Sequence, residues 1–445
     1  MRRFINSILL LTVLLCTLAN SAQNPLINDQ FTADPTARIF NGKVYVFPSH
    51  DIVPPDGEGR MEWFNMADYH VFSSANLTDW QDQGAIVSQD EVDWVNPDSY
   101  SMWAPDCVFE NGKYYFYFPS RSKDTVNIKG FTIGVAVADK PEGPFVVEDK
   151  PIEGVIGIDP NVFIDKDGKA YLYWSSQKFY VARLKGNMKE LATEPVEISN
   201  LPQEGLKEGP FIFERNGTYY LTYPHVANKT ERLEYATSQN PMGPFEVKGV
   251  IMDESPTGCW TNHQSIVNFE GQWYLFYHHN DYSPDFDKLR SIRADSLFFN
   301  KDGSIQKVEP TLRGVGVVNA TDKIQLDRYS DKSDEVAIEF NDSENTFEGW
   351  HAIFPEKGKW IRFNEVNFSK GLKTIKVKAI SENNGILEVR SEGKNGKLVA
   401  EINIPKNSKW KIFSTDISNY ISGNRDLYIT SKQGAMKIDW IQFYK

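Results

Sequence analysis

The chain has 445 residues, a net charge of −12 and only three cysteines. This length exceeds one ordinary hydrophobic core and predicts two or three domains. The acidic excess lies before Ser330, which argues against nucleic acid as a partner of that part of the chain. The cysteines are too few for a disulfide scaffold, so stability must come from burial of apolar side chains.

The first residues predict a signal peptide over residues 1–22. Two arginines precede an apolar run from Ile8 to Leu18, which is too short to span a bilayer. Because small residues cluster between Ala19 and Ala22, we expect cleavage there and an exported protein, periplasmic or extracellular. Cys16 leaves a lipid anchor as the less favoured alternative, since no small residue directly precedes it. No later stretch reaches the length of a membrane span.

One hairpin pattern recurs five times along the chain. A short apolar run is followed by a polar turn with glycine and then by an aromatic-rich strand. The turn glycines are Gly42, Gly112, Gly168, Gly217 and Gly271. Asn-Gly, Asp-Gly or Glu-Gly between apolar runs favours a tight hairpin turn. Spacings of 49 to 70 residues leave room for four strands per unit, which predicts a five-bladed β-propeller over residues 24–320.

A second domain is predicted over residues 335–445. The polar passage from Ser330 to Glu335 marks the boundary, and we expect the segment from Glu309 to Val317 to be the closing strand of the ring. Beyond the boundary, short alternating strands are separated by turns at Asn383-Asn384 and Asn395-Gly396. This pattern is typical of a β-sandwich, so the fold class of the whole chain is all-β.

An ionisable residue precedes each hairpin turn by six to nine positions, where the innermost strand of a blade lines the channel. These residues are Asp34, Asp106, Asp159, Glu208 and His263. Like charges crowded into a channel raise one another's pKa, so one carboxyl can stay protonated while another is ionised. Glycoside hydrolysis needs that division, because one group protonates the leaving oxygen and the other activates water.

A structural role in turns is the alternative to a catalytic role for these acids. An aspartate before proline is commonly a turn or cap residue, which applies to Asp34-Pro35 and Asp159-Pro160 taken singly. Turn chemistry does not require acids at equivalent places in successive blades. The repetition therefore favours a catalytic interpretation.

Four motifs carry a family resemblance: Ala33-Asp34-Pro35, Trp103-Ala104-Pro105-Asp106, Ile158-Asp159-Pro160 and Lys207-Glu208-Gly209-Pro210. With them, the segment from Asn24 to Val317 resembles glycoside hydrolase family 43, a five-bladed propeller family of inverting enzymes. The resemblance implies that Asp34 is the general base and Glu208 the general acid. It implies that Asp159 holds Glu208 in position and keeps its pKa raised.

Substrate-binding residues are also expected: Trp103, Asp106, His263 and Arg290. Trp103 would lie under the sugar ring or, alternatively, pack in the core. By the resemblance, His263 lies near a channel ion or water and Arg290 contacts the sugar; a buried hydrogen-bonded histidine and an exposed arginine are the alternatives. The long insertion from Asp51 to Asn65 is expected to shape the mouth of the pocket.

The second domain resembles a carbohydrate-binding module of family 6 through three segments, Gly358–Phe363, Gly385–Arg390 and Ile438–Phe443. The resemblance implies a structural calcium near the two ends of the module, with Glu339 and Asp439 as candidate ligands. No cofactor is expected for the chemistry. A purely structural appendage is the alternative to a sugar-binding module.

These inferences predict an exo-acting inverting hydrolase that releases a terminal pentose, α-L-arabinofuranose or β-D-xylose, from plant polysaccharides or oligosaccharides. The alternatives are a galactose-releasing enzyme of the same family and a non-catalytic sugar-binding propeller. We expect a monomer whose partner is a carbohydrate substrate.

Overall fold

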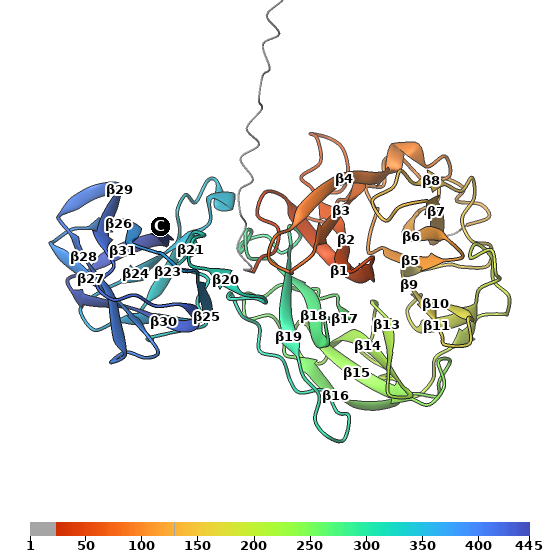
Figure 1. Cartoon of the computed structure of the whole chain (residues 1–445). Coiled ribbons are helices and arrows are strands. Elements are labelled where there is room, and N and C mark those ends of the chain that lie inside the picture. The colour runs from red at the N-terminus through yellow and green to blue at the C-terminus, as the bar shows by residue number, and fades with distance from the viewer. Residues whose placement is uncertain (1–23, 129) are drawn as a thin grey trace, which may run out of the picture.

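The computed structural model describes residues 24–128 and 130–445 (Figure 1). The predicted signal peptide and the alternative lipid anchor at Cys16 lie outside these residues. Within them, no helix has the length and apolar character needed to cross a membrane. The described helices are two short 3₁₀ turns, η1 (Gln89–Glu91) and η2 (Thr346–Glu348), so the chain is all-β as predicted.

Five antiparallel sheets are arranged as blades in a ring, which confirms the predicted propeller (Figure 1). The first two blades are β1 (Phe31–Phe40), β2 (Lys43–Asp51), β3 (Asp68–Ser74) and β4 (Gln81–Ser88), then β5 (Asp106–Glu110), β6 (Lys113–Arg121), β7 (Phe131–Ala138) and β8 (Val146–Val147). The third is β9 (Ile158–Ile164), β10 (Ala170–Ser175), β11 (Phe179–Arg183) and β12 (Val196–Glu197). The last two are β13 (Phe211–Arg215), β14 (Thr218–Val226), β15 (Glu231–Ser238) and β16 (Glu246–Met252), then β17 (Ser265–Phe269), β18 (Gln272–His279) and β19 (Ser291–Leu297).

Each blade opens with the hairpin that the sequence predicts. Between β1 and β2, for example, Phe40 pairs with Lys43, and the two turn residues Asn41 and Gly42 have φ values of 51° and 75°. Positive φ angles at both central residues are typical of the type I′ turn, whose backbone twist matches that of the flanking strands. Neighbouring blades pack through shared apolar clusters, such as the one that joins Phe47 of the first blade to Phe116 of the second.

The ring closes differently from the prediction. The fifth blade has three strands, and residues 309–317 contain no strand, so the expected closing strand there is wrong. The N–H of Leu26 donates to the carbonyl of Ile292 at 2.9 Å, and the Asn24 side chain bonds both the carbonyl and the N–H of Ala294. Residues 24–26 thus occupy the part of the β19 edge at Ile292 and Ala294, where a further strand would pair.

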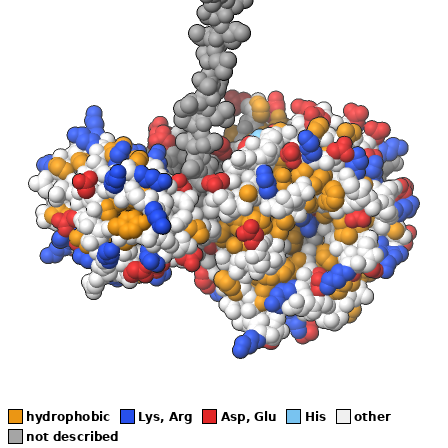
Figure 2. Space-filling model, in the orientation of Figure 1, with side chains coloured by type: hydrophobic (Ala, Val, Ile, Leu, Met, Phe, Trp, Pro, Cys, Tyr) orange, Lys and Arg blue, Asp and Glu red, His pale blue; other side chains and the backbone are white. Residues whose placement is uncertain are grey.

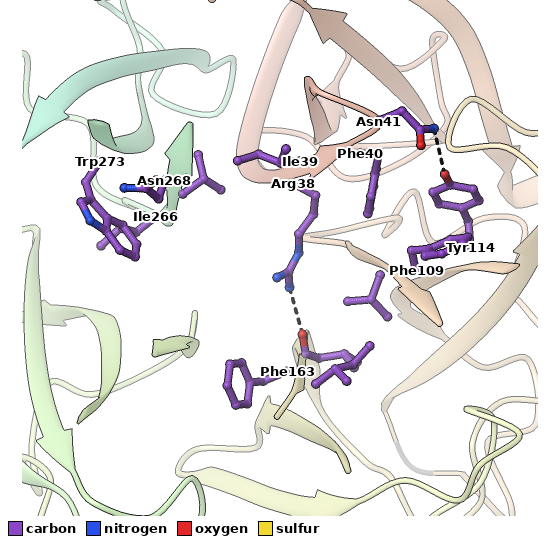
Figure 3. A pocket seen from close by; sticks show the side chains of 14 residues that line it. Arg38, Ile39, Phe40, Asn41, Phe109, Tyr114, Phe163, Ile266, Asn268 and Trp273 are labelled. Atoms are coloured by element: carbon purple, nitrogen blue, oxygen red, sulfur yellow. Dashed lines mark hydrogen bonds between the residues drawn. The ribbon is translucent and has the colours of Figure 1, made fainter. Parts of the chain in front are cut away.

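The hairpin end of the channel opens into a pocket of about 510 Å³ (Figure 3). The Arg38 side chain lies in its centre, and its Nη2 donates to the carbonyl of Val162 at 3.0 Å. Hydrophobic side chains gather around the middle of the ring on the face shown in Figure 2, with charged ones spread over its rim. This pocket lies at the opposite end of β1 from Asp34, because the turn follows Phe40 and Asp34 lies near the start of the strand.

A β-sandwich follows the propeller, as predicted, and packs two six-stranded sheets around one apolar core. One sheet holds β20 (Val318–Asn319), β22 (Asp331–Lys332), β25 (Trp360–Phe368), β27 (Gly385–Ser391), β28 (Lys397–Ile404) and β30 (Gly423–Gln433). The other holds β21 (Ile324–Gln325), β23 (Ala337–Phe340), β24 (Trp350–Phe354), β26 (Thr374–Ser381), β29 (Asn407–Asp416) and β31 (Met436–Tyr444). The sandwich begins before residue 335, because β20, β21 and β22 already pair with its strands.

The two domains are in contact through aromatic side chains. The rings of Tyr282 and Trp350 stack with centroids 4.8 Å apart, and Phe31 contacts Phe347 at the same centroid distance. Arg328 donates to the Tyr282 hydroxyl at 3.2 Å. Trp350 is therefore part of the domain interface, which leaves its ring unavailable for stacking on a sugar.

We predict that Asp106→Ala lowers the free energy of unfolding by about 3–5 kcal/mol. The Asp106 carboxylate is fully buried and accepts bonds from Nε and Nη2 of Arg38, at 2.9 and 2.6 Å, and from the N–H of Val162 at 2.6 Å. It thus joins three blades, and its removal leaves the guanidinium partly unpaired. Denaturant unfolding measures the loss. Asp139→Ala, which breaks an exposed pair with Lys113, is the control and should leave stability almost unchanged; equal losses would contradict the prediction.

Candidate active site

Asp34 and Asp159 occupy the same kind of β-bulge in two different blades. Asp34 and Pro35 together lie opposite Pro48 alone, and Asp159 and Pro160 lie opposite Trp174. Asp34 and Asp159 have φ values of 47° and 56°, an uncommon conformation for residues other than glycine. A bulge re-aims a side chain away from the ordinary alternation of a strand. The repeated Asp-Pro motif therefore marks the two places where a carboxylate is turned into the pocket.

The third acid, Glu208, lies just before β13. The N–H of Gly209 donates to Oδ2 of Asp159 at 2.8 Å, so Asp159 fixes the backbone beside Glu208. Gly209 has a φ of 73°, and a Cβ there would meet the ring of Pro224 at 2.7 Å. Only glycine fits this close approach. The Glu-Gly-Pro motif thus positions Glu208 through the residue that follows it.

The three acids line one pocket of about 140 Å³, together with His263 and Arg290. Its aromatic lining comes from Trp103, from Trp63 and Phe64 of the long insertion, and from Trp260. Trp103 packs on Phe131 with ring centroids 4.5 Å apart, and its Nε1 has no hydrogen-bond partner among the described residues. The insertion that was expected to shape the mouth therefore contributes lining residues.

Arg290 links Asp34 to Asp51. Nε and Nη2 of Arg290 donate to the two carboxylate oxygens of Asp51, both at 2.9 Å, and its Nη1 donates to Oδ1 of Asp34 at 2.8 Å. Only 3% of Arg290 is exposed, which excludes the alternative of a solvated arginine. Although burial alone would lower the pKa of Arg290, Asp34 and Asp51 raise it. The guanidinium is therefore a permanent positive charge beside the pocket.

Asp34 is held in its ionised form. Burial on its own would raise the pKa of Asp34, but the charge of Arg290, followed by the neighbouring His278 and His263 and by a hydrogen bond from Ser49 at 2.7 Å, brings it down to about 2. His278 accepts a bond at Nδ1 from the N–H of Asp34 and lies 3.1 Å from the carbonyl of Thr261 at Nε2. This arrangement requires a neutral His278 protonated at Nε2, in agreement with a pKa lowered to about 3, chiefly by burial.

Glu208 has the opposite electrostatic environment. Burial, followed by the negative charge of Asp34, raises the pKa of Glu208 to about 7, against the smaller opposing effect of Arg290. The pKa of Asp159 is also raised, by burial and then by the charges of Glu208 and Asp34. One acid of the pocket is thus ionised and another retains a proton near neutral pH, which is the division that general acid–base catalysis requires.

Two further acids take part that the sequence analysis did not single out as site residues. Asp51 ends β2 and pairs with Arg290; Glu231 begins β15 and is fully buried. Oε2 of Glu231 accepts the N–H of Asn262 at 2.8 Å, and burial raises its pKa well above the usual range. Asn262 lies within the segment that supplies Trp260, Thr261 and His263 to the pocket. Neither acid follows the hairpin-based pattern, so only three-dimensional contacts reveal them.

Of the other two expected substrate-binding residues, Asp106 lies outside the pocket and His263 lines it. Asp106 does not line the pocket, because Arg38 and backbone N–H groups occupy its oxygens, and we assign it a structural role. His263 lines the pocket as predicted; its Nδ1 lies 3.9 Å from Oδ1 of Asp34, and burial lowers the pKa of its ring. It is a buried histidine beside the acid.

The calcium ligands implied by the second domain each lie beside a lysine. Nζ of Lys378 lies 2.6 Å from Oδ2 of Asp439, and Nζ of Lys437 lies 3.6 Å from Oε2 of Glu339. Calcium needs six to eight oxygen ligands, whereas each of these carboxylates faces an ammonium group. Glu339 and Asp439 are therefore ion-pair partners of lysines in this structure, and their role as calcium ligands stays a prediction.

We predict that Glu231→Ala lowers the free energy of unfolding by about 1–3 kcal/mol, because the buried N–H of Asn262 loses its acceptor. Glu231→Gln keeps an acceptor oxygen and the side-chain shape, so it should cost less. Denaturant unfolding measures both. Glu153→Ala, at an exposed position, is the control. A glutamine variant as unstable as the alanine variant would contradict a neutral Glu231.

Comparisons with known proteins agree with this geometry. The sequence model of Glycosyl hydrolases family 43 matches residues 22–305, and that of Carbohydrate binding module (family 6) matches residues 328–445. Xylosidase/arabinosidase 43A of Humicola insolens is 37% identical over 335 residues, which cover 64% of this chain and 99% of that protein.

Two solved structures extend the likeness. One is CoXyl43, a family 43 β-xylosidase/α-arabinofuranosidase from a compost microbial metagenome, solved with xylotriose in a calcium-free form. Its TM-score is 0.59 at 36% identity, and the match covers 65% of this chain and 98% of that chain. An arabinoxylan arabinofuranohydrolase from Bacillus subtilis, solved with cellotetraose, has a TM-score of 0.56 at 26% identity over 96% and 100% of the two chains. The chain thus belongs to glycosyl hydrolase family 43 and is an inverting glycoside hydrolase with a carbohydrate-binding module of family 6.

Proposed function

We propose that this enzyme is an exo-acting hydrolase that removes a terminal β-D-xylose or α-L-arabinofuranose from plant polysaccharides or oligosaccharides. The observation that carries the proposal is the meeting of an ionised Asp34 and a protonated Glu208 in one small pocket. We also propose export of the enzyme, on the basis of the arginines and the apolar run in residues 1–22.

In the mechanism we propose, Asp34 accepts a proton from water as that water attacks the anomeric carbon. Glu208 gives its proton to the oxygen of the leaving sugar, and the C–O bond breaks with inversion. Arg290 and the Ser49 hydroxyl keep Asp34 ionised and oriented for the first proton transfer. Asp159, through the N–H of Gly209, positions Glu208 for the second.

Pocket size supports exo action on a small sugar. The volume of about 140 Å³ falls below the range of about 300–1,000 Å³ that is usual for drug-sized ligands. Trp63, Phe64 and Trp103 provide apolar surfaces for the carbon faces of a ring, and the acids provide polar contacts. The names of the Humicola insolens relative and of CoXyl43 support xylose or arabinose as that sugar.

A non-catalytic sugar-binding propeller is the competing function. Sugar binding alone does not require two buried carboxyls whose pKa values are moved in opposite directions. The separation of these pKa values therefore favours catalysis over simple binding.

We predict that Asp34→Asn and Glu208→Gln each reduce kcat by about 10²–10⁴-fold on chromogenic β-D-xylosides and α-L-arabinofuranosides. Both changes keep side-chain shape and remove the proton acceptor or donor. The measurement is release of the chromophore, with the anomer of the released sugar followed by NMR on the natural glycoside. Glu153→Gln is the control and should turn over normally. Unchanged turnover in either site variant would contradict the assigned roles, and rapid hydrolysis of galactosides alone would contradict the proposed sugar.

We predict that kcat/KM falls roughly tenfold per pH unit above about pH 7, because Glu208 loses its proton there. Below that pH Glu208 stays protonated, and Asp34 stays ionised until the pH approaches its pKa of about 2. The rate should therefore be nearly constant over weakly acidic pH while the protein stays folded. The measurement is kcat/KM as a function of pH, with a substrate that does not hydrolyse spontaneously over the pH range used. A maximum on the alkaline side of neutrality would show that the acid and base have been assigned incorrectly.

A further inference from the structure

A cluster of two histidines and one aspartate lies outside the catalytic pocket, at the paired ends of β2 and β3. Its members are His50, next to the last residue of β2, and Asp68 and His70, at the start of β3. One ligand atom from each of the three lies within 4.8 Å of the other two. In the described part of the chain, this is the only such group of three or more potential metal-ligating side chains.

The histidines of this cluster are held in fixed orientations. Nδ1 of His70 lies 2.9 Å from Oδ2 of Asp82, and Nδ1 of His50 lies 2.6 Å from Oδ1 of Asp68. The two rings meet edge to face with centroids 5.1 Å apart. Among the described residues, Nε2 of His70 has no hydrogen-bond partner. A carboxylate on one ring nitrogen with the other nitrogen free is the arrangement that orients histidine ligands in metal sites.

From this geometry we propose that His50, Asp68 and His70 bind a divalent transition-metal ion such as Zn²⁺, with Asp82 orienting His70. Two imidazoles and a carboxylate suit zinc and its neighbours, whereas calcium and magnesium prefer oxygen ligands. Around a tetrahedral zinc with bonds of about 2.0–2.1 Å, ligand atoms are about 3.3 Å apart. Binding of zinc would replace the hydrogen bond of 2.6 Å between Nδ1 of His50 and Oδ1 of Asp68 with two bonds to the ion.

The site is open enough for an ion to enter and to keep a water ligand. The side chains of His50 and His70 are 19% and 20% exposed, and that of Asp68 is 30% exposed. The carboxylates of Asp68 and Asp82 supply negative charge next to the rings. A pair of ordinary histidine–carboxylate hydrogen bonds is the alternative, but it does not require potential ligand atoms of all three side chains to lie within 4.8 Å of one another.

An ion bound at this cluster would affect the pocket through residues 51–67. His50 and Asp68 flank residues 51–67, the connection that carries Trp63 and Phe64 into the pocket lining. Asp51, the neighbour of His50, is the residue that holds Arg290. A bound ion would join the two ends of this connection and limit its motion. We therefore infer that metal binding protects residues 51–67 from local opening.

The test is calorimetric titration of the full, untagged, EDTA-treated chain with zinc chloride. We expect one zinc ion per chain, and a loss of affinity of at least about tenfold in His50→Gln and in His70→Gln. Asp82→Asn, which removes the orienting carboxylate without removing a ligand, should weaken binding by about 10–100-fold. Circular dichroism checks that each variant is folded. Zinc should also slow proteolytic cleavage within residues 51–67 in the unaltered protein, and not in His70→Gln.

His351→Gln is the matched control, because His351 lies in the second domain next to Asn341, outside the cluster. It should bind zinc as the unaltered chain does. Absence of stoichiometric zinc binding in the unaltered protein would overturn the proposal, as would equal affinity in the folded His50→Gln and His70→Gln variants. These readouts are independent of hydrolytic activity, so failure here leaves the proposed hydrolase function unaffected.

Discussion

The buried guanidinium of Arg290 sets the charge state of the whole site. It pairs with both oxygens of Asp51 and with Asp34, so one positive charge already faces two negative ones. Burying a further ionised carboxylate without a partner is costly, and a buried acid keeps its proton instead. Asp159, Glu208 and Glu231 accordingly have raised pKa values. The charge of Arg290 thus keeps Asp34 ionised, whereas the buried acids without such a partner keep their protons.

The way the ring closes brings this cation to its partner. Asp34 and Arg290 are far apart in sequence, yet the N–H of Thr32 donates to the carbonyl of Arg290 at 2.9 Å. Residues 24–26 run along β19 and place β1 beside the last blade. The contact that closes the propeller therefore also brings the catalytic base, Asp34, beside Arg290. Destabilising the ring at this seam should disturb catalysis even without a change in the pocket itself.

Local sequence signals predicted the hairpins and three acids of the pocket, because each depends on a few consecutive residues. Asn41-Gly42 specifies its own turn, and the Asp-Pro pairs mark bulges. Asp51 and Glu231 escaped prediction because their partners, Arg290 and Asn262, are distant in the chain. Asp106 followed the same pattern as the catalytic acids, but Arg38 takes up its carboxylate. Pairing across blades decides such cases, and patterns of a few consecutive residues do not reveal that pairing.

The proposed catalysis requires that Asp34 is ionised while Glu208 carries a proton in the resting enzyme. Neutron diffraction from a deuterium-exchanged crystal at about pH 6 tests it directly, since deuterium atoms on carboxyl groups become visible. We expect a deuterium on Glu208 and none on Asp34. A deuterium on Asp34, or an ionised Glu208 in the same crystal, would contradict it.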